Sequence, residues 1–383
     1  MKNLIAYNTT DLNALLITEK AKTWFKRGWL SPESWTKIKA NYATNFYSPN
    51  IFMRIGGFIF SIILMMSVLA ILALFMGRNI DKSLPLLSVL IGLISMAFLE
   101  FIIKAKHYKS GIDDAFLYSG LCLIIGGLTE FLHLNPTKLP FYCLFLPCLM
   151  IAAMRYVDSL LTIVAYIFSL IIVILTMFKM PTIAPLILPF VIMLLSVIIY
   201  LIIIRIQQNK ASIYWYTNLN ILEALSLITF YASGNYFILQ KANETYFNNS
   251  MVAMPYIFWF FTFIIPILYI YKGLKDKNRL LLSLGLLAIA AGVATFRCYF
   301  HVLPMEIAAV IGGVILLALA YFSIKYLRDN KTPFSYDDDE GDKPFYQHAE
   351  SLIIAQSFGH QQEGEKPLFG GGDFGGGGAG SAF

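Results

Sequence analysis

The sequence predicts an all-α, polytopic transmembrane helical bundle of about ten helices. Hydrophobic residues make up 58% of the 383 residues and charged residues only 14%, whereas a soluble domain carries about 25% charged residues. Apolar stretches of about twenty residues recur along the chain, and an α-helix of that length crosses a bilayer. This composition excludes a water-soluble enzyme, a nucleic-acid-binding domain and a secreted domain held by disulfides.

Residues 1–50 are predicted to form a short cytoplasmic N-terminal helical hairpin. Thr18 is expected to cap the first helix, which ends at Gly28, while Ser31 followed by Pro32 is the favoured start of the second. Apolar side chains recur every three to five residues along one face: Leu30, Trp35, Ile38 and Tyr42. Two interpretations remain open. The hairpin lies on the membrane or against the first loops, or it docks a partner.

Residues 51–327 form the predicted transmembrane domain, in which hydrophobic segments follow one another. They span roughly residues 51–76, 84–103, 113–133, 138–155, 158–179, 181–205, 213–240, 251–272, 278–297 and 303–327. The fourth segment contains Pro140 and Pro147, which favours a kinked or re-entrant helix. Only Lys179, Met180 and Pro181 separate the fifth segment from the sixth. Because the two together are too long for one helix, a tight hairpin is expected there.

An even number of spans places both termini on the same side of the membrane. With the N-terminus inside, the basic residues of the cytoplasmic loops are Lys104, Lys106, Lys109, Arg155, Arg205, Lys210, Lys272, Lys275, Lys277 and Arg279. Those of the opposite loops are Arg78, Lys82, Lys138, Lys179, Lys241 and Arg297. Because cytoplasmic loops carry an excess of Lys and Arg, this bias predicts that both termini are cytoplasmic.

Residues 328–383 are predicted to be a flexible cytoplasmic tail, acidic at first and glycine-rich at its end. Asp337–Glu340 is an acidic run, and the glycine content from Gly370 onward cannot support a packed core. Phe374 and the terminal Phe383 are the aromatic residues of this ending. They predict a peptide recognised by a soluble or membrane protein partner, with the Phe383 carboxylate in the recognised group. The alternative is an inert flexible end.

Glu223 lies inside the seventh segment, where a carboxylate costs about 2.5–3.5 kcal/mol on insertion scales. At 100° per residue it shares one helix face with further polar residues, namely Asn218, Ser226, Thr229 and Ser233. This polar stripe predicts a substrate path or a proton relay. The alternative is that Glu223 is protonated, or paired with a basic residue, and only ties helices together.

A second polar cluster surrounds the second and third segments: Glu100, His107, Asp113 and Asp114. Either aspartate is placed to cap the third segment, and pairing with Lys104, Lys106 or Lys109 is expected to balance the charges. The spacing fits no strong metal-ligand template, so no metal site is predicted. Arg155 and Asp158 stand three residues apart and are expected to pair on one helix face.

No residue pattern in the sequence indicates an enzyme or a bound cofactor. The phosphate-binding loop, the H-E-x-x-H zinc motif and the G-x-S-x-G nucleophile motif are all missing. Four cysteines fall in or beside apolar segments, which favours packing in the core: Cys122, Cys143, Cys148 and Cys298. We therefore predict no catalytic residues, no cofactor and no nucleic acid partner.

Three stretches carry a family resemblance: I-T-E-K-A-K-T-W-F-K-R-G-W-L-S-P-E-S-W at 17–35, G-I-D-D-A-F-L-Y-S-G-L at 111–121, and L-G-L-L-A-I-A-A-G-V-A-T-F-R-C-Y-F-H-V-L-P-M-E-I-A at 284–308. With the glycine-rich ending Phe369–Phe383, they resemble uncharacterised Bacteroidota polytopic membrane proteins. These proteins are similar to the predicted membrane proteins of the domain-of-unknown-function 2157 type. The resemblance implies a multi-pass protein of the bacterial inner membrane and supplies no mechanism.

Together these observations predict an inner-membrane scaffold or sensor. Membrane lipid surrounds the bundle, and the hairpin and the tail engage protein partners. The alternative is a proton-coupled secondary transporter or a lipid-handling protein that uses the stripe around Glu223. An intramembrane enzyme is a third class, which requires residues distant in the sequence to assemble a site.

Overall fold

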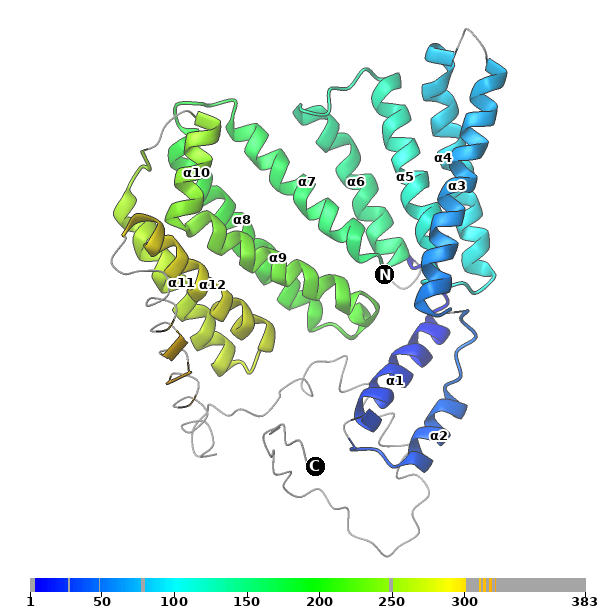
Figure 1. Cartoon of the computed structure of the whole chain (residues 1–383), viewed down its shortest axis with the longest axis horizontal. Coiled ribbons are helices and arrows are strands. Elements are labelled where there is room, and N and C mark those ends of the chain that lie inside the picture. Colours follow the sequence, from blue (N-terminus) through cyan, green and yellow to red (C-terminus); the bar gives the residue numbers. More distant parts are fainter. Residues whose placement is uncertain are drawn as a thin grey trace, which may run out of the picture.

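The computed structural model describes residues 4–26, 28–47, 49–76, 80–247 and 251–300, together with residues 310, 313, 314, 317, 318 and 321. Within these ranges the chain is all-helical and contains no named strand (Figure 1). The helices are α1 (Thr9–Lys26), α2 (Pro32–Asn41), α3 (Ile51–Met76), α4 (Ile80–Lys104), α5 (Ile112–Phe131), α6 (Leu139–Tyr156), α7 (Ser159–Met177), α8 (Ala184–Gln207), the 3₁₀ segment η3 (Lys210–Trp215), α9 (Tyr216–Gly234), α10 (Tyr236–Phe247), α11 (Pro255–Lys275) and α12 (Arg279–Tyr299).

Eight of the described helices are long and apolar enough to cross a bilayer, namely α3 to α8, α11 and α12. The chain is therefore a multi-pass membrane protein, as the sequence predicted. The tight turn expected between the fifth and sixth segments separates α7 from α8. The fourth segment is one continuous helix, α6, with Pro147 inside it, so it is not re-entrant. The tenth segment, residues 303–327, lies mostly outside the described residues.

The prediction that the seventh segment, residues 213–240, forms one helix is wrong, because the structure divides it into α9 and α10. The chain bends by 76° between α9 and α10, at Asn235. The Asn235 Oδ1 atom accepts hydrogen bonds from the backbone N–H groups of Phe237 and Ile238, 3.0 and 3.2 Å away. Its Nδ2 atom donates to the Tyr231 hydroxyl and to Thr295 Oγ1, both at 3.0 Å. Asn235 thus caps α10, and the cap ends the continuous helix.

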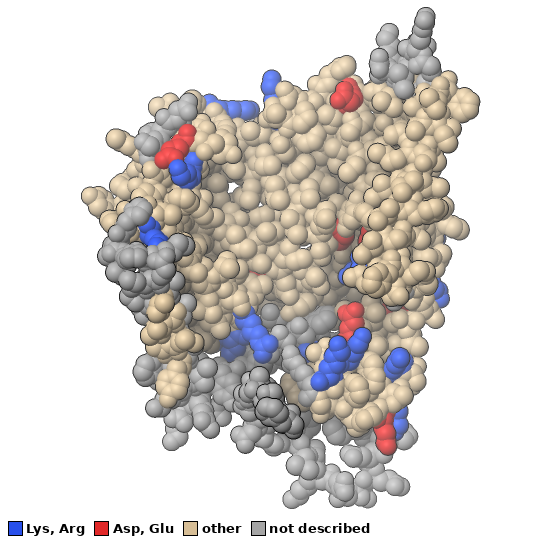
Figure 2. All heavy atoms as spheres, viewed as in Figure 1, with Lys and Arg blue, Asp and Glu red and all other residues tan. Residues whose placement is uncertain are grey.

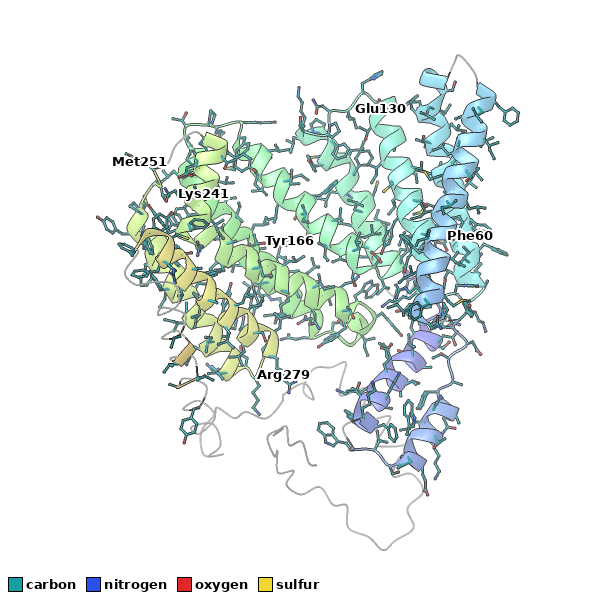
Figure 3. The ribbon with its side chains drawn as sticks, in the orientation of Figure 1. Phe60, Glu130, Tyr166, Lys241, Met251 and Arg279 are labelled. Atoms are coloured by element: carbon teal, nitrogen blue, oxygen red, sulfur yellow. The ribbon has the colours of Figure 1, made fainter. Side chains whose placement is uncertain are left out.

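The spans alternate between two ends of the bundle, and α1 and α2 lie beyond one of them, here named the hairpin end (Figure 1). Figure 3 shows Arg279 towards this end, with Glu130 and Lys241 at the opposite, far end. Across the middle of the face drawn in Figure 2, charged side chains are few. An uncharged belt between two charged rims is what a bilayer requires.

The helices pack around two hydrophobic cores. The larger core joins α1 and α3 to α7, with Leu99, Phe116 and Leu149 among its buried residues. The smaller core joins α8, α9, α11 and α12, with Ile265 and Leu281 among its buried residues. The four cysteines expected in the core are exposed instead. A thiol on the outer face of a membrane helix meets lipid, so facing outward costs it little.

The hairpin has a small core of its own, made by Ile17, Ala21, Leu30 and Ile38. The Ser31 hydroxyl oxygen caps α2, with Pro32 at its first position, as predicted. The expected cap at Thr18 is wrong, because α1 begins nine residues earlier, at Thr9. Thr18 lies inside the helix, where its hydroxyl donates to the Ala14 carbonyl oxygen at 2.8 Å.

Helices α4 and α5 approach closely because small residues line their contact. A Cβ atom built on Gly127 would lie 2.5 Å from the Pro85 carbonyl oxygen, and one on Gly92 would lie 2.8 Å from the Gly120 carbonyl oxygen. Beyond the Gly92–Gly120 contact, the Ser95 hydroxyl donates to the Phe116 carbonyl oxygen at 2.9 Å. Close backbone approach through small residues is the usual way in which membrane helices associate.

Replacing Gly127 with alanine is expected to destabilise the bundle, because the new methyl group meets backbone atoms of α4. Overpacking of this kind costs about 1–3 kcal/mol. Gly126 is the matched control, since a Cβ there has nothing within 4 Å. We expect thermal unfolding in detergent to show a lower midpoint for Gly127→Ala and an unchanged or higher one for Gly126→Ala. Equal midpoints would contradict the close contact of α4 and α5.

Candidate functional site

Residues 154–159, here named the α6–α7 corner, form hydrogen bonds with several segments that are distant in the sequence. The corner turns at Val157, whose φ is 51°. A β-branched residue in this left-handed region is strained. After it, the Asp158 carboxylate caps α7 by accepting a hydrogen bond from the Leu161 N–H at 2.7 Å.

Three backbone carbonyls of the corner accept hydrogen bonds from other elements. The Ala6 N–H donates to the Arg155 oxygen at 2.9 Å, which ties the N-terminal arm, residues 4–12, to the end of α6. The indole N–H of Trp215, in η3, donates to the Met154 oxygen at 2.8 Å. The side-chain amide of Asn218, in α9, donates to the Asp158 oxygen at 3.2 Å. The carbonyls that α6 leaves unpaired at its end therefore bind two distant segments.

Side chains of the corner reach the helices on its other side. Arg155 Nε and the Tyr156 hydroxyl both donate to Glu100 Oε1, in α4, at 2.8 Å. The Tyr118 hydroxyl, in α5, donates to Asp158 Oδ2 at 2.8 Å. The predicted Arg155–Asp158 pair is therefore wrong, because each residue has a partner on a different helix.

The acidic cluster separates in the structure. Asp114 pairs with Arg54 of α3 at 2.7 Å, rather than with the expected Lys104, Lys106 or Lys109. Asp113 is 1% exposed, and its Oδ1 atom accepts bonds from the Ser110 N–H and hydroxyl at 2.9 and 3.0 Å. Neither aspartate is the expected cap. Helix α5 begins at Ile112, so both aspartates lie inside its first turn, and the capping position is occupied by Gly111, which has no side chain to cap with.

Glu100 and His107 have other partners than these two aspartates. Glu100 binds Arg155 and Tyr156, as above, and the His107 ring contacts the Tyr47 ring at a centroid distance of 5.0 Å. Two buried atoms here, His107 Nδ1 and Asp113 Oδ2, lack a hydrogen-bond partner among the described residues. Over the same part of the chain, no group of His, Cys, Asp and Glu is arranged to hold a metal ion.

Glu223 is held at a junction of three helices. It is 2% exposed and accepts a hydrogen bond on each oxygen. Gln207 Nε2, at the end of α8, donates to Oε2 at 3.1 Å, and Asn278 Nδ2, just before α12, donates to Oε1 at 3.0 Å. Asn278 also caps α12 through its Oδ1 atom. Because Gln207 ends α8 and Asn278 immediately precedes α12, Glu223 lies towards the hairpin end, about 10 Å along α9 from its start.

The other residues of the polar stripe face different neighbours. Asn218 binds the corner and accepts from the Ser159 hydroxyl at 3.3 Å. Ser226 and Ser233 donate to carbonyl oxygens of their own helix, those of Glu223 and Thr229. Thr229 and Ser233 border an apolar groove of about 340 Å³, whereas Ser226 borders another near Tyr200 and Lys272. The stripe therefore divides between two grooves. The predicted partner-binding residues Phe374 and Phe383 lie outside the described residues.

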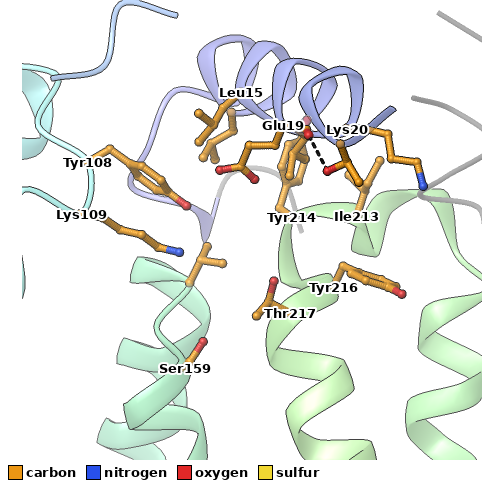
Figure 4. A pocket seen from close by; sticks show the side chains of 14 residues that line it. Leu15, Glu19, Lys20, Tyr108, Lys109, Ser159, Ile213, Tyr214, Tyr216 and Thr217 are labelled. Carbon is orange, nitrogen blue, oxygen red and sulfur yellow. Dashed lines mark hydrogen bonds between the residues drawn. The ribbon is translucent and has the colours of Figure 1, made fainter. Parts of the chain in front are cut away.

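A cleft of about 320 Å³ lies beside the corner, between α1 and the hairpin end of the bundle (Figure 4). Its lining mixes apolar side chains with charged and hydroxyl groups: Leu12, Leu15, Leu16, Glu19, Lys20, Thr23, Tyr108, Lys109, Val157, Ser159, Ile213, Tyr214, Tyr216 and Thr217. We name this space the α1 cleft. Sequence reasoning missed it because its walls come from segments up to two hundred residues apart, and no local pattern brings them together.

Comparison with known proteins gives no relative for this chain. No family model, no curated protein and no solved structure matches it.

Replacing Glu223 with alanine is expected to destabilise the protein, because the Asn278 amide loses its acceptor and the Gln207 amide keeps only the Asn220 side chain. A part-buried donor left without a partner costs about 1–3 kcal/mol. The matched control is Glu130→Ala, since Glu130 is exposed at the far end. Thermal unfolding in detergent should show a lower midpoint for Glu223→Ala alone. A midpoint equal to that of Glu130→Ala would show that Glu223 is no structural tie.

Proposed function

We propose that this multi-pass membrane protein is a scaffold or sensor whose N-terminal hairpin engages a partner protein. One observation carries the proposal: the hairpin is a separate packed unit whose first residues belong to the core of the membrane bundle. Ile5, Tyr7 and Leu12 pack in the larger core, while Ile17, Ala21 and Ile38 form the hairpin core. We therefore expect a change within the bundle to move the hairpin with it.

The N-terminal arm supports this coupling by its burial. Tyr7 is 8% exposed, and its ring contacts the rings of Phe46 and Tyr108. Burial, together with the nearby Asp113 carboxylate, raises the pKa of the Tyr7 hydroxyl well above its ordinary value. Tyr7 thus stays neutral in the core. The buried arm therefore connects the hairpin to the membrane bundle.

The hairpin also presents aromatic surface away from the bundle. Trp29, at the turn between α1 and α2, is 60% exposed. Phe25 is 37% exposed and stacks on Trp35 with ring centroids 5.8 Å apart. Aromatic residues are enriched where proteins bind one another. The hairpin lies beyond the ends of the spans (Figure 1), which favours docking of a partner over burial in the lipid.

The proposal places the hairpin and both termini in the cytoplasm. The structure sorts the described loops into the two ends that the charge comparison used, and the hairpin end holds more of the basic residues. That asymmetry supports a cytoplasmic hairpin end. Location in a bacterial inner membrane rests on the family resemblance. The tail, with Phe374 and Phe383, is proposed as a second segment that binds a soluble or membrane protein partner.

Proton-coupled transport or lipid handling is the second candidate, favoured by the burial of Glu223. A carboxylate within a span is a functional candidate in general. However, both Glu223 oxygens already accept hydrogen bonds from side-chain amides. This arrangement suits a structural tie between three helices better than a group that is free to act on a transported substrate.

Cross-linked capture of partners from cell extract, read by mass spectrometry, tests the proposal. Replacing Trp29 and Phe25 with alanine is expected to reduce capture of a hairpin partner at least about tenfold, as aromatic anchors contribute 2 kcal/mol or more. Phe60→Ala is the control, since Phe60 is 67% exposed on α3 but lies within a span. A chain ending at Arg328 tests the tail in the same way.

Glu223→Gln separates the two candidates in the same preparation. The scaffold or sensor keeps its partners in this variant, whereas a proton-coupled transporter reconstituted in vesicles loses proton flux. A partner list unchanged by the Trp29 and Phe25 substitutions and by removal of the tail would overturn the proposed function. Proton-coupled transport or lipid handling would then be the remaining candidate function.

A further inference from the structure

We propose that the α1 cleft binds a zwitterionic headgroup in which a primary ammonium is linked to a phosphate, as in an ethanolamine phospholipid. The inference rests on the proposed sensor function, for which this headgroup would be the signal. It deepens that function by naming the ligand, and it can be tested without any protein partner.

Opposite charges from different elements extend into the same space. Figure 4 shows the Glu19 carboxylate, from α1, and the Lys109 ammonium, from the loop between α4 and α5, on facing walls of the cleft, whereas Lys20 extends away from them. Among the described residues, neither Glu19 nor Lys109 forms an ion pair. A ligand that carries both charges satisfies both groups at once, with its ammonium on Glu19 and its phosphate on Lys109.

Tyrosine hydroxyls add donors for a phosphate. Tyr214 lines the cleft, is 9% exposed, and its hydroxyl has no hydrogen-bond partner among the described residues. The Tyr108 hydroxyl points into the same space beside Lys109 (Figure 4). Burial and the nearby Glu19 carboxylate raise the pKa of Tyr108 to about 12. Tyr108 is therefore a neutral donor under physiological conditions, suited to a phosphate oxygen.

The remaining wall is apolar and lies at the depth of the helix ends. Leu12 and Leu15 come from α1, Val157 from the corner and Ile213 from η3. A volume of about 320 Å³ accommodates a headgroup with its glycerol. Because spans end at this level (Figure 1), a lipid reaches the cleft with its acyl chains still in the bilayer. This position favours a lipid over a free amino-phosphate.

Other common headgroups match the cleft less well. A phosphoglycerol headgroup is anionic only, so the Glu19 carboxylate repels it and gains no partner. A choline headgroup carries the same charges as ethanolamine, but its trimethylammonium has no N–H to donate to Glu19. The preference for ethanolamine over choline therefore depends on Glu19, while Lys109 holds the phosphate that both share.

Binding of defined lipids to the intact purified chain in detergent, measured by native mass spectrometry, tests the inference. The probes are short-chain phosphatidylethanolamine, phosphatidylcholine, phosphatidylglycerol and free phosphoethanolamine. We expect ethanolamine lipid to bind about tenfold more tightly than choline lipid, the effect of one charge-assisted hydrogen bond. Glu19→Gln should abolish this preference. Lys109→Met should weaken both lipids while leaving the preference in place.

Two substitutions outside the cleft serve as controls. Glu33→Gln and Lys39→Gln alter α2, outside the cleft, and should change nothing. Equal binding of ethanolamine and choline lipids by the wild type, or an unchanged preference in Glu19→Gln that keeps the wild-type unfolding midpoint, overturns the inference. Free phosphoethanolamine binding as tightly as the lipid would overturn the lipid source and retain the chemical class.

The two proposals fail in distinguishable ways. An ethanolamine preference that depends on Glu19, found without any hairpin-dependent protein partner, supports the cleft and overturns the scaffold or sensor. A hairpin-dependent partner found without any lipid preference supports the scaffold or sensor and overturns the lipid site in the cleft.

Discussion

The α6–α7 corner is the constraint on which the rest of the structure depends. Its backbone carbonyls bind the N-terminal arm and the region where η3 meets α9, while its side chains bind α4 and α5. These bonds require a sharp turn, and Val157 makes it in the left-handed region. Such a conformation costs about 1–2 kcal/mol, which the bonds formed on either side offset. Strain held by surrounding contacts of this kind is typical of functional sites.

The corner and Glu223 both join several helices at the hairpin end of the molecule. Glu223 joins α8, α9 and α12 there through Gln207 and Asn278, while the corner joins the N-terminal arm to α4, α5 and α9. In Figure 1, α5, α6 and α7 converge towards this end. The hairpin and the α1 cleft therefore lie beside groups that join several helices, and the proposed ligand or partner would contact that connected region.

The sequence predicted what depends on local pattern and missed what depends on partners. Apolar length located the spans, and Ser31 followed by Pro32 located the start of α2, because a cap needs only neighbouring residues. The spacing of Arg155 and Asp158 suggested a local pair, but Glu100 and Tyr118 on other helices compete for them. The break at Asn235 had a signal in the Gly234–Asn235 dipeptide, which ends one helix and caps the next. Nothing local indicated that Ala6, Trp215 and Asn218 meet at one corner.

Amide hydrogen exchange of the N-terminal arm, followed by mass spectrometry of the intact protein in detergent, tests the central claim most directly. If the arm is fixed to the α6–α7 corner, the Ala6 amide, which donates to the Arg155 carbonyl oxygen, exchanges as slowly as the amides of residues 116–121 in α5. It also exchanges far more slowly than the amides of residues 43–45, which have no helical bonds. Exchange of Ala6 as fast as that of residues 43–45 would contradict the coupling of the hairpin to the membrane bundle.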